Sequence, residues 1–197
     1  MKIPSIVQAV ASTLIRQHPP RIEPMPTADP FPAILKKVLV HEGGFIDHPK
    51  DPGGATMKGV TQATYNGWRA RQGKEPRSVR FITDAELTAI YRRDFWDRVR
   101  GDDLPPGINY AVFDFAVNSG VSRAARYLQK VVGVAQDGQI GPNTLSATRS
   151  KDPAAVIDQL CDDRLAFMRS LRIWPTFGKG WRRRVDDVRR VAKTMIA

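Results

Sequence analysis

Apolar residues recur along most of this chain at spacings of three and four, the period of a helix with one buried face. The first such stripe runs to Glu42, and Gly43 and Gly44 follow it as a stop signal. The members of the stripe are Phe31, Ile34, Leu35, Val38 and Leu39. The pattern predicts a helix that carries the Glu42 carboxyl on its buried face.

Further helices are expected downstream, each with a recognisable start or stop signal. Thr61 and the Thr83–Glu86 capping box begin two of them, Pro142 and Asp152–Pro153 begin two more, and Gly133 ends another. The two central helices are expected over residues 108–119 and 121–132, and a last one carries Trp181, Val185, Val188 and Met195 inward. Residues 44–59 are dense in Gly, Pro and Asp, and no segment alternates β-branched residues. The expected fold is all-α, with at most one small β-hairpin after Glu42.

The N-terminal 30 residues differ in composition from the rest. Residues 16–32 hold six of the fifteen prolines, which predicts a flexible tail over 1–30 and a folded region from Phe31 onward. The mildly apolar stretch before residue 15 is interrupted by Gln8 and Ser12, so a cleaved signal peptide is not expected.

Charge narrows the partners but does not select one. The net charge of +11 implies an anionic partner, which leaves nucleic acid, lipopolysaccharide, anionic lipid and cell-wall polymer open. In the final helix Arg182, Arg183, Arg184, Arg189 and Arg190 fill most of the face away from the apolar stripe. This arginine-rich face is expected to be solvated, or to bind an anionic envelope. Cys161 falls on an apolar stripe and is expected in the core.

The carboxylates around the first helix suggest the chemistry. A buried carboxyl favours its protonated form, which is what a general acid needs near neutral pH. Glycoside hydrolysis pairs such an acid with a second carboxylate, and both Asp47 and Asp51 follow Glu42 closely. Each of these aspartates also fits an ordinary turn residue. His18, His41 and His48 lack metal-ligand spacing, so no metal site is expected.

The stretch HEGGFIDHPKDPGGATMKGVT, from His41 to Thr61, resembles the signature of glycoside hydrolase family 108. YRRDFWDRV at 91–99 and FDFAVNSGVSRAARYLQKVVGVAQDGQIGPNTL at 113–145 continue the resemblance, the latter into a peptidoglycan-binding region. The Glu42–Asp51–Thr56 spacing is also similar to the Glu-Asp-Thr set of lysozyme-like phage enzymes, with one residue of difference in the second interval.

The resemblance implies a lysozyme-like helical fold, with a catalytic region over 31–105 and a peptidoglycan-binding-like region over 106–195 in the same compact unit. Glu42 would be the proton donor, Asp51 would position water or stabilise charge, and Thr56 would hold that water. Asp47, Gly54 and Asn118 would contact substrate, although Asn118 also fits a helix C-cap. The implied function is an endolysin-type N-acetylmuramidase that needs no cofactor.

Two alternatives remain at this stage: a lytic transglycosylase that uses Glu42 alone, and a non-catalytic peptidoglycan-binding protein. The implied partners are peptidoglycan glycan strands and, through the arginine-rich last helix, an anionic outer membrane or lipopolysaccharide. We expect a monomer with no nucleic-acid partner, because no nucleic-acid-binding signature accompanies the charge. It would be made in a bacterial cytoplasm and act on the wall in the periplasm, after holin-type release or export.

Overall fold

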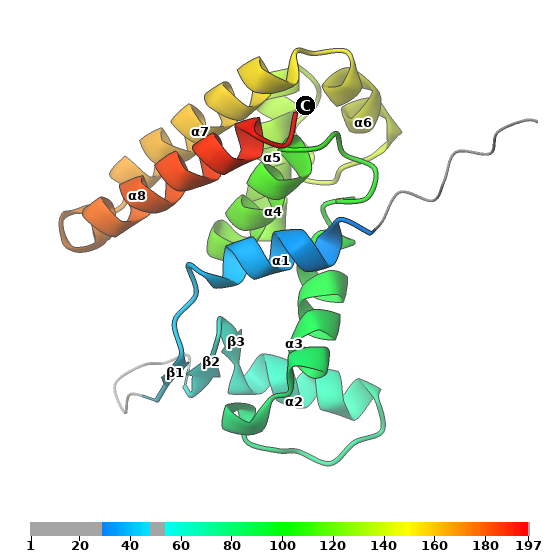
Figure 1. The fold of residues 1–197 in the computed structure, drawn as a ribbon, viewed down its shortest axis with the longest axis vertical. Helices are drawn as coiled ribbons and strands as arrows, with labels where there is room; N and C mark the ends of the chain where they lie inside the picture. Colours follow the sequence, from blue (N-terminus) through cyan, green and yellow to red (C-terminus); the bar gives the residue numbers. More distant parts are fainter. Residues whose placement is uncertain (1–28, 48–53, 197) are drawn as a thin grey trace, which may run out of the picture.

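The computed structural model describes residues 29–47 and 54–196, and its helices form two groups (Figure 1). One group surrounds a small sheet and contains α2 (Gln62–Arg71), η1 (Val79–Phe81) and α3 (Asp84–Tyr91). The other contains α4 (Ile108–Ser119), α5 (Val121–Val132), α6 (Pro142–Arg149), α7 (Pro153–Arg169) and α8 (Trp174–Lys193). The first helix, α1 (Phe31–Leu39), lies between the two groups, and the π-helical η2 (Arg92–Trp96) continues α3 toward the second. The flexible tail expected over 1–30 falls almost entirely outside the described residues.

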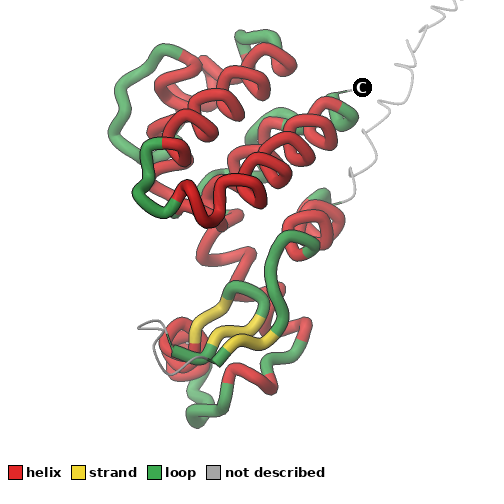
Figure 2. Tube along the Cα trace, turned by 90° about the vertical axis from the view of Figure 1, so that its left-hand side faces the viewer, coloured by secondary structure: helices red, strands yellow, loops and turns green. Residues whose placement is uncertain are grey.

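The all-α expectation is confirmed, but the sheet is larger than one hairpin. In the described part of the chain it contains three antiparallel strands in the order β1 (Phe45–Ile46), β2 (Thr56–Met57) and β3 (Val60–Thr61). Figure 2 shows this sheet at the end of the molecule opposite the helical bundle. The β2–β3 turn has Lys58 at φ 46° and Gly59 at φ 77°. Two successive positive φ values suit the tight hairpin turn whose twist matches that of the strands.

Most predicted helix boundaries are confirmed. The two central helices have the expected limits, and Gly133 ends α5 in a left-handed conformation at φ 80°. The capping box of α3 is present, since Thr83 and Glu86 each accept a hydrogen bond from the other's backbone N–H. The Asp152 side chain accepts from the backbone N–H of Ala155 at 2.8 Å and begins α7. Local capping chemistry therefore determines where these helices start.

The hydrophobic core runs through the junction of the two groups. Phe31 of α1 lies 5.4 Å from Trp96 of η2 and 5.9 Å from Phe113 of α4, measured between ring centroids. Cys161 is buried in this core at 2% exposure, as predicted. None of the helices in the described ranges is both long enough and apolar enough to cross a bilayer. Since α1 packs on both groups, the segment that follows it emerges at their junction.

Candidate active site

Glu42 lies in a tight turn after α1, not on the helix, so that part of the prediction is wrong. The helix ends at Leu39, and the backbone N–H groups of His41 and Glu42 donate to the carbonyls of Val38 and Leu39 at 3.0 and 3.2 Å. These bonds span three residues instead of four, which tightens the chain before it turns toward β1. The tighter turn still directs the Glu42 side chain toward the buried face of α1, as the apolar stripe predicted. The Glu42 side chain is 16% exposed, so its predicted near-burial at the end of the stripe is correct.

Arg184 of α8 holds one carboxylate oxygen of Glu42. Its Nη1 lies 2.9 Å from Glu42 Oε1, and its side chain is only 9% exposed. By its angles this contact is an ion pair without an aligned hydrogen bond to Oε1 from any described residue. The pair joins the turn after α1 to α8, the last helix of the group that begins with α4.

Arg184 is itself held by Asp114, which is fully buried in the middle of α4. Arg184 Nε donates to both Asp114 oxygens at 3.1 Å, and its Nη2 donates to Oδ2 at 2.9 Å. Arg164 of α7 donates from Nη1 to Asp114 Oδ1 at 2.7 Å and from Nη2 to Asn118 Oδ1 at 3.2 Å. The result is a chain of alternating charges, Glu42, Arg184, Asp114 and Arg164, which we call the buried charge chain.

Burial and charge act in opposite directions on Asp114. Desolvation raises the pKa of Asp114. The adjacent Arg164 and Arg184 guanidinium groups and their hydrogen bonds lower it by more than desolvation raises it, so the net pKa lies below the ordinary carboxyl value. Asp114 is therefore ionised at neutral pH and fixes both arginines. A paired and hydrogen-bonded arginine in a nearly dry site has little freedom to change its direction.

The second carboxylate oxygen of Glu42 faces the β2–β3 turn. A methyl group built onto Gly59 would lie 3.0 Å from Glu42 Oε2 and 2.6 Å from the Tyr91 hydroxyl, so only glycine fits between them. The Tyr91 hydroxyl donates to the Lys58 carbonyl at 2.8 Å. Burial raises the pKa of Tyr91, and the nearby Glu42 carboxylate raises it further. The phenol is therefore a hydrogen-bond donor that fixes the turn against Glu42.

A further contact beside Glu42 joins the same two segments. His41 Nε2 lies 3.3 Å from Asp187 Oδ2, one helical turn after Arg184 on α8. Consecutive residues of the turn, His41 and Glu42, thus both contact α8. This double contact fixes the direction in which the turn leaves α1.

The other predicted site residues are placed as follows. Thr56 lies in β2, where its Oγ1 donates to the Gly54 carbonyl at 3.2 Å, and Gly54 has a φ of 67° that favours glycine. Asp47 is exposed directly after β1. Asp51 lies outside the described residues, so the geometry of the predicted Glu42–Asp51 pair stays a prediction.

Asn118, one of the predicted substrate contacts, also contacts the buried charge chain through Arg164. Its Oδ1 accepts from Arg164 and from the Ser119 hydroxyl at 3.0 Å. The bond to a sugar that we predict for Asn118 would therefore be made by its amide NH₂ group. The C-cap of α4 is Gly120, so Asn118 lies inside the last helical turn and is not the cap.

Sequence reasoning missed the three charged residues that support Glu42. Arg184 was assigned to the solvated arginine face, whereas its side chain is buried and paired. The signal was present, since Arg184 lies three residues after Trp181 and four before Val188, both on the apolar stripe. Asp114 interrupts the run of apolar and aromatic residues from Tyr110 to Val117, a position at which a charge needs a partner. Arg164 lies in the apolar stripe of α7 and is that partner.

The segment between α5 and α6, residues 134–141, is held by hydrogen bonds to one buried side chain. The buried Gln129 side chain donates to Asp137, to the Gln139 carbonyl and to Thr144, and accepts from the Gly138 N–H. These bonds fix the turn before α6 internally. In the described parts of the chain, no group of three or more His, Cys, Asp and Glu side chains is arranged to hold a metal ion.

The comparisons with known proteins agree with this architecture. The family model of glycosyl hydrolase 108 matches residues 35–120, and a predicted peptidoglycan domain matches residues 123–186. The solved structure of SagA from Brucella abortus is 46% identical, with a TM-score of 0.75, and the match covers 84% of this chain and 95% of that one. No curated protein matches.

A nearly buried glutamate between a small sheet and a helical bundle, on a chain with a peptidoglycan domain, defines a lysozyme-like glycoside hydrolase of peptidoglycan. The chain belongs to glycosyl hydrolase family 108. The two family models meet near residues 121–122, at the start of α5. The division that we expected at 105/106 stays a prediction.

Proposed function

We propose that the protein is an N-acetylmuramidase that hydrolyses the β-1,4 bond between N-acetylmuramic acid and N-acetylglucosamine, with Glu42 as the general acid. The observation that carries the proposal is the position of Glu42, at the junction of the two helix groups, with Oε1 held by Arg184. The family 108 match covers this residue, and the peptidoglycan-domain match supplies the substrate class.

The two oxygens of Glu42 have different surroundings, which suits proton donation. Oε1 faces Arg184, whereas Oε2 faces the β2–β3 turn at Gly59. A proton carried on Oε2 would make Glu42 a neutral carboxyl whose Oε1 faces Arg184 as a carbonyl oxygen, and loss of that proton would restore the ion pair. Donating that proton to the glycosidic oxygen would break the bond to the leaving sugar and generate oxocarbenium-like charge on the other sugar.

The remaining steps are assigned to Asp51 and Thr56. Asp51 would stabilise the positive charge on the sugar or orient the attacking water, and the Thr56 hydroxyl would hold that water. Thr56 supports this assignment by lying on β2, directly before the turn that faces Glu42. Water attack would leave a reducing muramic-acid end on the product.

The test is clearance of purified, outer-membrane-free cell walls, followed by mass spectrometry of the fragments. Glu42→Gln should lower the rate by about 10²–10⁴-fold, because the amide cannot supply the proton. Glu75→Gln, at an exposed loop position, is the matched control and should keep full activity. Reducing muramic-acid ends would support the proposal. Anhydro ends, together with an active Asp51→Ala variant, would replace it with a lytic transglycosylase, and wall binding without release would leave a binding protein.

We further propose that the protein is made in a bacterial cytoplasm and acts on the wall in the periplasm, in host lysis or wall remodelling. The exposed arginines of α8, Arg182, Arg183 and Arg190, would add attraction to an anionic envelope. Cells that produce the protein should lyse only after their inner membrane is permeabilised. Lysis without permeabilisation would show that the chain crosses that membrane unaided.

A further inference from the structure

Three aromatic rings lie together on the first two turns of α8, and the proposed acid chemistry does not use them. The Phe177 and Trp181 ring centroids are 5.8 Å apart, with an angle of 26° between the planes, and Trp174 lies 6.2 Å from Trp181. Phe177 is 52% exposed, whereas Trp174 and Trp181 pack partly on the core. We call these three residues the aromatic platform.

Small residues shape this platform. A methyl group on Gly178 would lie 2.6 Å from the Trp174 ring, so glycine is needed for that ring to lie flat along the helix. One on Gly180 would meet nothing within 4 Å, so the surface between Phe177 and Arg184 is open there. The Trp174 ring thus lies against Gly178, and the Phe177 ring is the most exposed of the three.

Helical geometry places the platform beside Glu42. Phe177 precedes Arg184 by seven residues, which is about 10 Å along the helix and within about 20° of the same direction around it. Arg184 points at Glu42 from that side of α8. Phe177 therefore projects from the same side of α8 as Arg184, which contacts Glu42, about two helical turns away.

We propose that the aromatic platform binds a sugar ring of the glycan strand that Glu42 cleaves, as a subsite remote from the scissile bond. The C–H face of a pyranose ring is apolar and flat, so it stacks on an exposed aromatic ring while its hydroxyls stay in water. All three platform residues lie inside the region, 123–186, that matches a peptidoglycan domain. The inference rests on the proposed function for its ligand class.

An anionic membrane fits this surface less well. Trp174 and Trp181 are partly covered by the core, so Phe177 and the preceding Ile173, each 52% exposed, are the large apolar side chains exposed at the start of α8, whereas an interfacial helix inserts a whole apolar face. A single projecting ring in line with a catalytic acid suits one sugar of a chain. A polymer bound at both places would also be aligned across Glu42.

The first measurement is binding, made without catalysis. In a Glu42→Gln background, the Kd for peptide-free glycan strands is measured by calorimetry with and without Phe177→Ala. We expect Phe177→Ala to raise the Kd about tenfold, which corresponds to about 1.4 kcal/mol. Phe81→Ala removes a ring that is 62% exposed on η1, in the other helix group, and is the matched control that should leave the Kd unchanged.

The second measurement is hydrolysis with Glu42 intact. Phe177→Ala should raise KM for the same strands about tenfold and leave kcat within twofold, since the ring is remote from the reacting atoms. If wild type hydrolyses the strands and neither Kd nor KM changes in the variant, the platform inference is wrong while the proposed function stands. If wild type hydrolyses nothing but Kd still rises, the proposed function fails and the platform stands. A loss of binding to anionic phospholipid vesicles alone, with glycan binding intact, would assign the platform to the membrane.

Discussion

At the scale of single residues, Arg184 connects the proposed acid to the interior of the protein. Its guanidinium binds Glu42 on one edge and Asp114 on the other. Lysine has one point of charge and cannot make both contacts in the same fixed geometry. Arg184 is therefore a positioning residue, whose planar shape matters as much as its charge.

Arg184→Lys should lower kcat on purified peptidoglycan by about 10–100-fold. Losses of this size are typical when a residue that orients a functional side chain, without touching the substrate, is replaced. KM should stay within about threefold, because the substrate contacts are retained. Steady-state kinetics on wild type, Arg184→Lys and the exposed neighbour Arg183→Lys measure the effect. Circular dichroism of each variant checks that the fold persists, and a kcat equal to that of wild type would refute the positioning role.

Cys161 offers a second prediction at this scale. Burial raises the pKa of its thiol to about 11, so roughly one thiol in a thousand is ionised at pH 8. Because the thiolate is the reactive form, native protein should react with a disulfide reagent far more slowly than the urea-unfolded chain. Absorbance of the released thiolate follows both reactions. Equal rates in the two states would show that the thiol is accessible.

At the scale of elements, the start of α4 depends on a close backbone approach. Gly107 has a φ of 80°, and a methyl group built on it would lie 2.4 Å from the backbone carbonyl oxygen of Ala192, near the end of α8. Gly133, which ends α5 at the same φ, has nothing within 4 Å of such a methyl group. Replacing Gly107 therefore adds a steric collision to backbone strain, whereas replacing Gly133 adds backbone strain alone.

Gly107→Ala should destabilise the protein by at least about 3 kcal/mol, since the collision adds to the strain of positive φ. Gly133→Ala should cost about 1–2 kcal/mol, from the strain alone. Urea unfolding followed by circular dichroism compares the two variants. A similar loss at both positions would mean that α8 moves aside easily.

Element boundaries were predicted well where a local signal sets them. Thr83, Pro142 and Asp152 act on their own first turns, so the sequence contains the whole cause. The end of α1 was predicted less well, because Glu42 is pulled into its turn by contacts with α8 and with the β2–β3 turn. Glu42 itself was recognisable as a candidate from its motif. The partners of Asp114 were not, because Arg164 of α7 and Arg184 of α8 lie 50 and 70 residues later in the chain. Spacing along one element cannot reveal such pairs.

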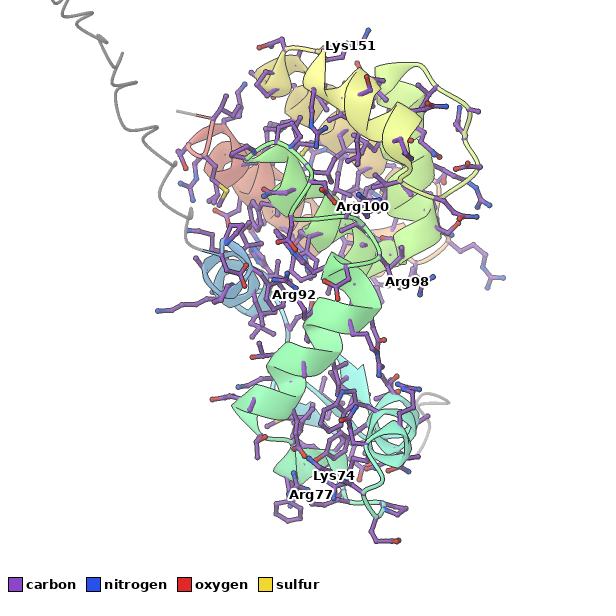
Figure 3. All side chains as sticks on the ribbon, turned by 90° about the vertical axis from the view of Figure 1, so that its right-hand side faces the viewer. Lys74, Arg77, Arg92, Arg98, Arg100 and Lys151 are labelled. Atoms are coloured by element: carbon purple, nitrogen blue, oxygen red, sulfur yellow. The ribbon has the colours of Figure 1, made fainter. Side chains whose placement is uncertain are left out.

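At the scale of the whole molecule, basic residues lie along its full length. Figure 3 shows Lys74 and Arg77 near the end with the sheet, Arg92, Arg98 and Arg100 toward the middle, and Lys151 at the far end. Several are paired, such as Arg77 with Glu86 and Arg92 with Asp102. The net charge of +11 remains, so association with an anionic wall should weaken as salt rises.

Stability should fall in acid through Asp114, which ties together α4, α7 and α8. Its folded-state pKa lies below the unfolded value of about 3.9, so in acid the unfolded chain binds the extra proton first. The stabilisation is complete above about pH 5 and is lost as pH falls through the lowered folded-state pKa. Urea unfolding between pH 7 and pH 3 should show this decline.

Asp114→Asn should remove this part of the pH dependence and cost about 3–5 kcal/mol at pH 7, because two arginines lose their buried counter-charge. An acid decline identical to that of wild type would assign the effect to other carboxylates.

The ion pair between Glu42 and Arg184 also limits how this protein can be recombined. The two partners lie in different family-model regions, one within 35–120 and the other within 123–186. A piece that stops at residue 120 would contain the whole hydrolase signature and still lack Arg184, the cation that contacts Glu42, the proposed acid. Chimaeras that exchange the C-terminal half among relatives should therefore be active only when the incoming half brings an arginine at the equivalent place, so the two halves are expected to be inherited, and engineered, as one unit.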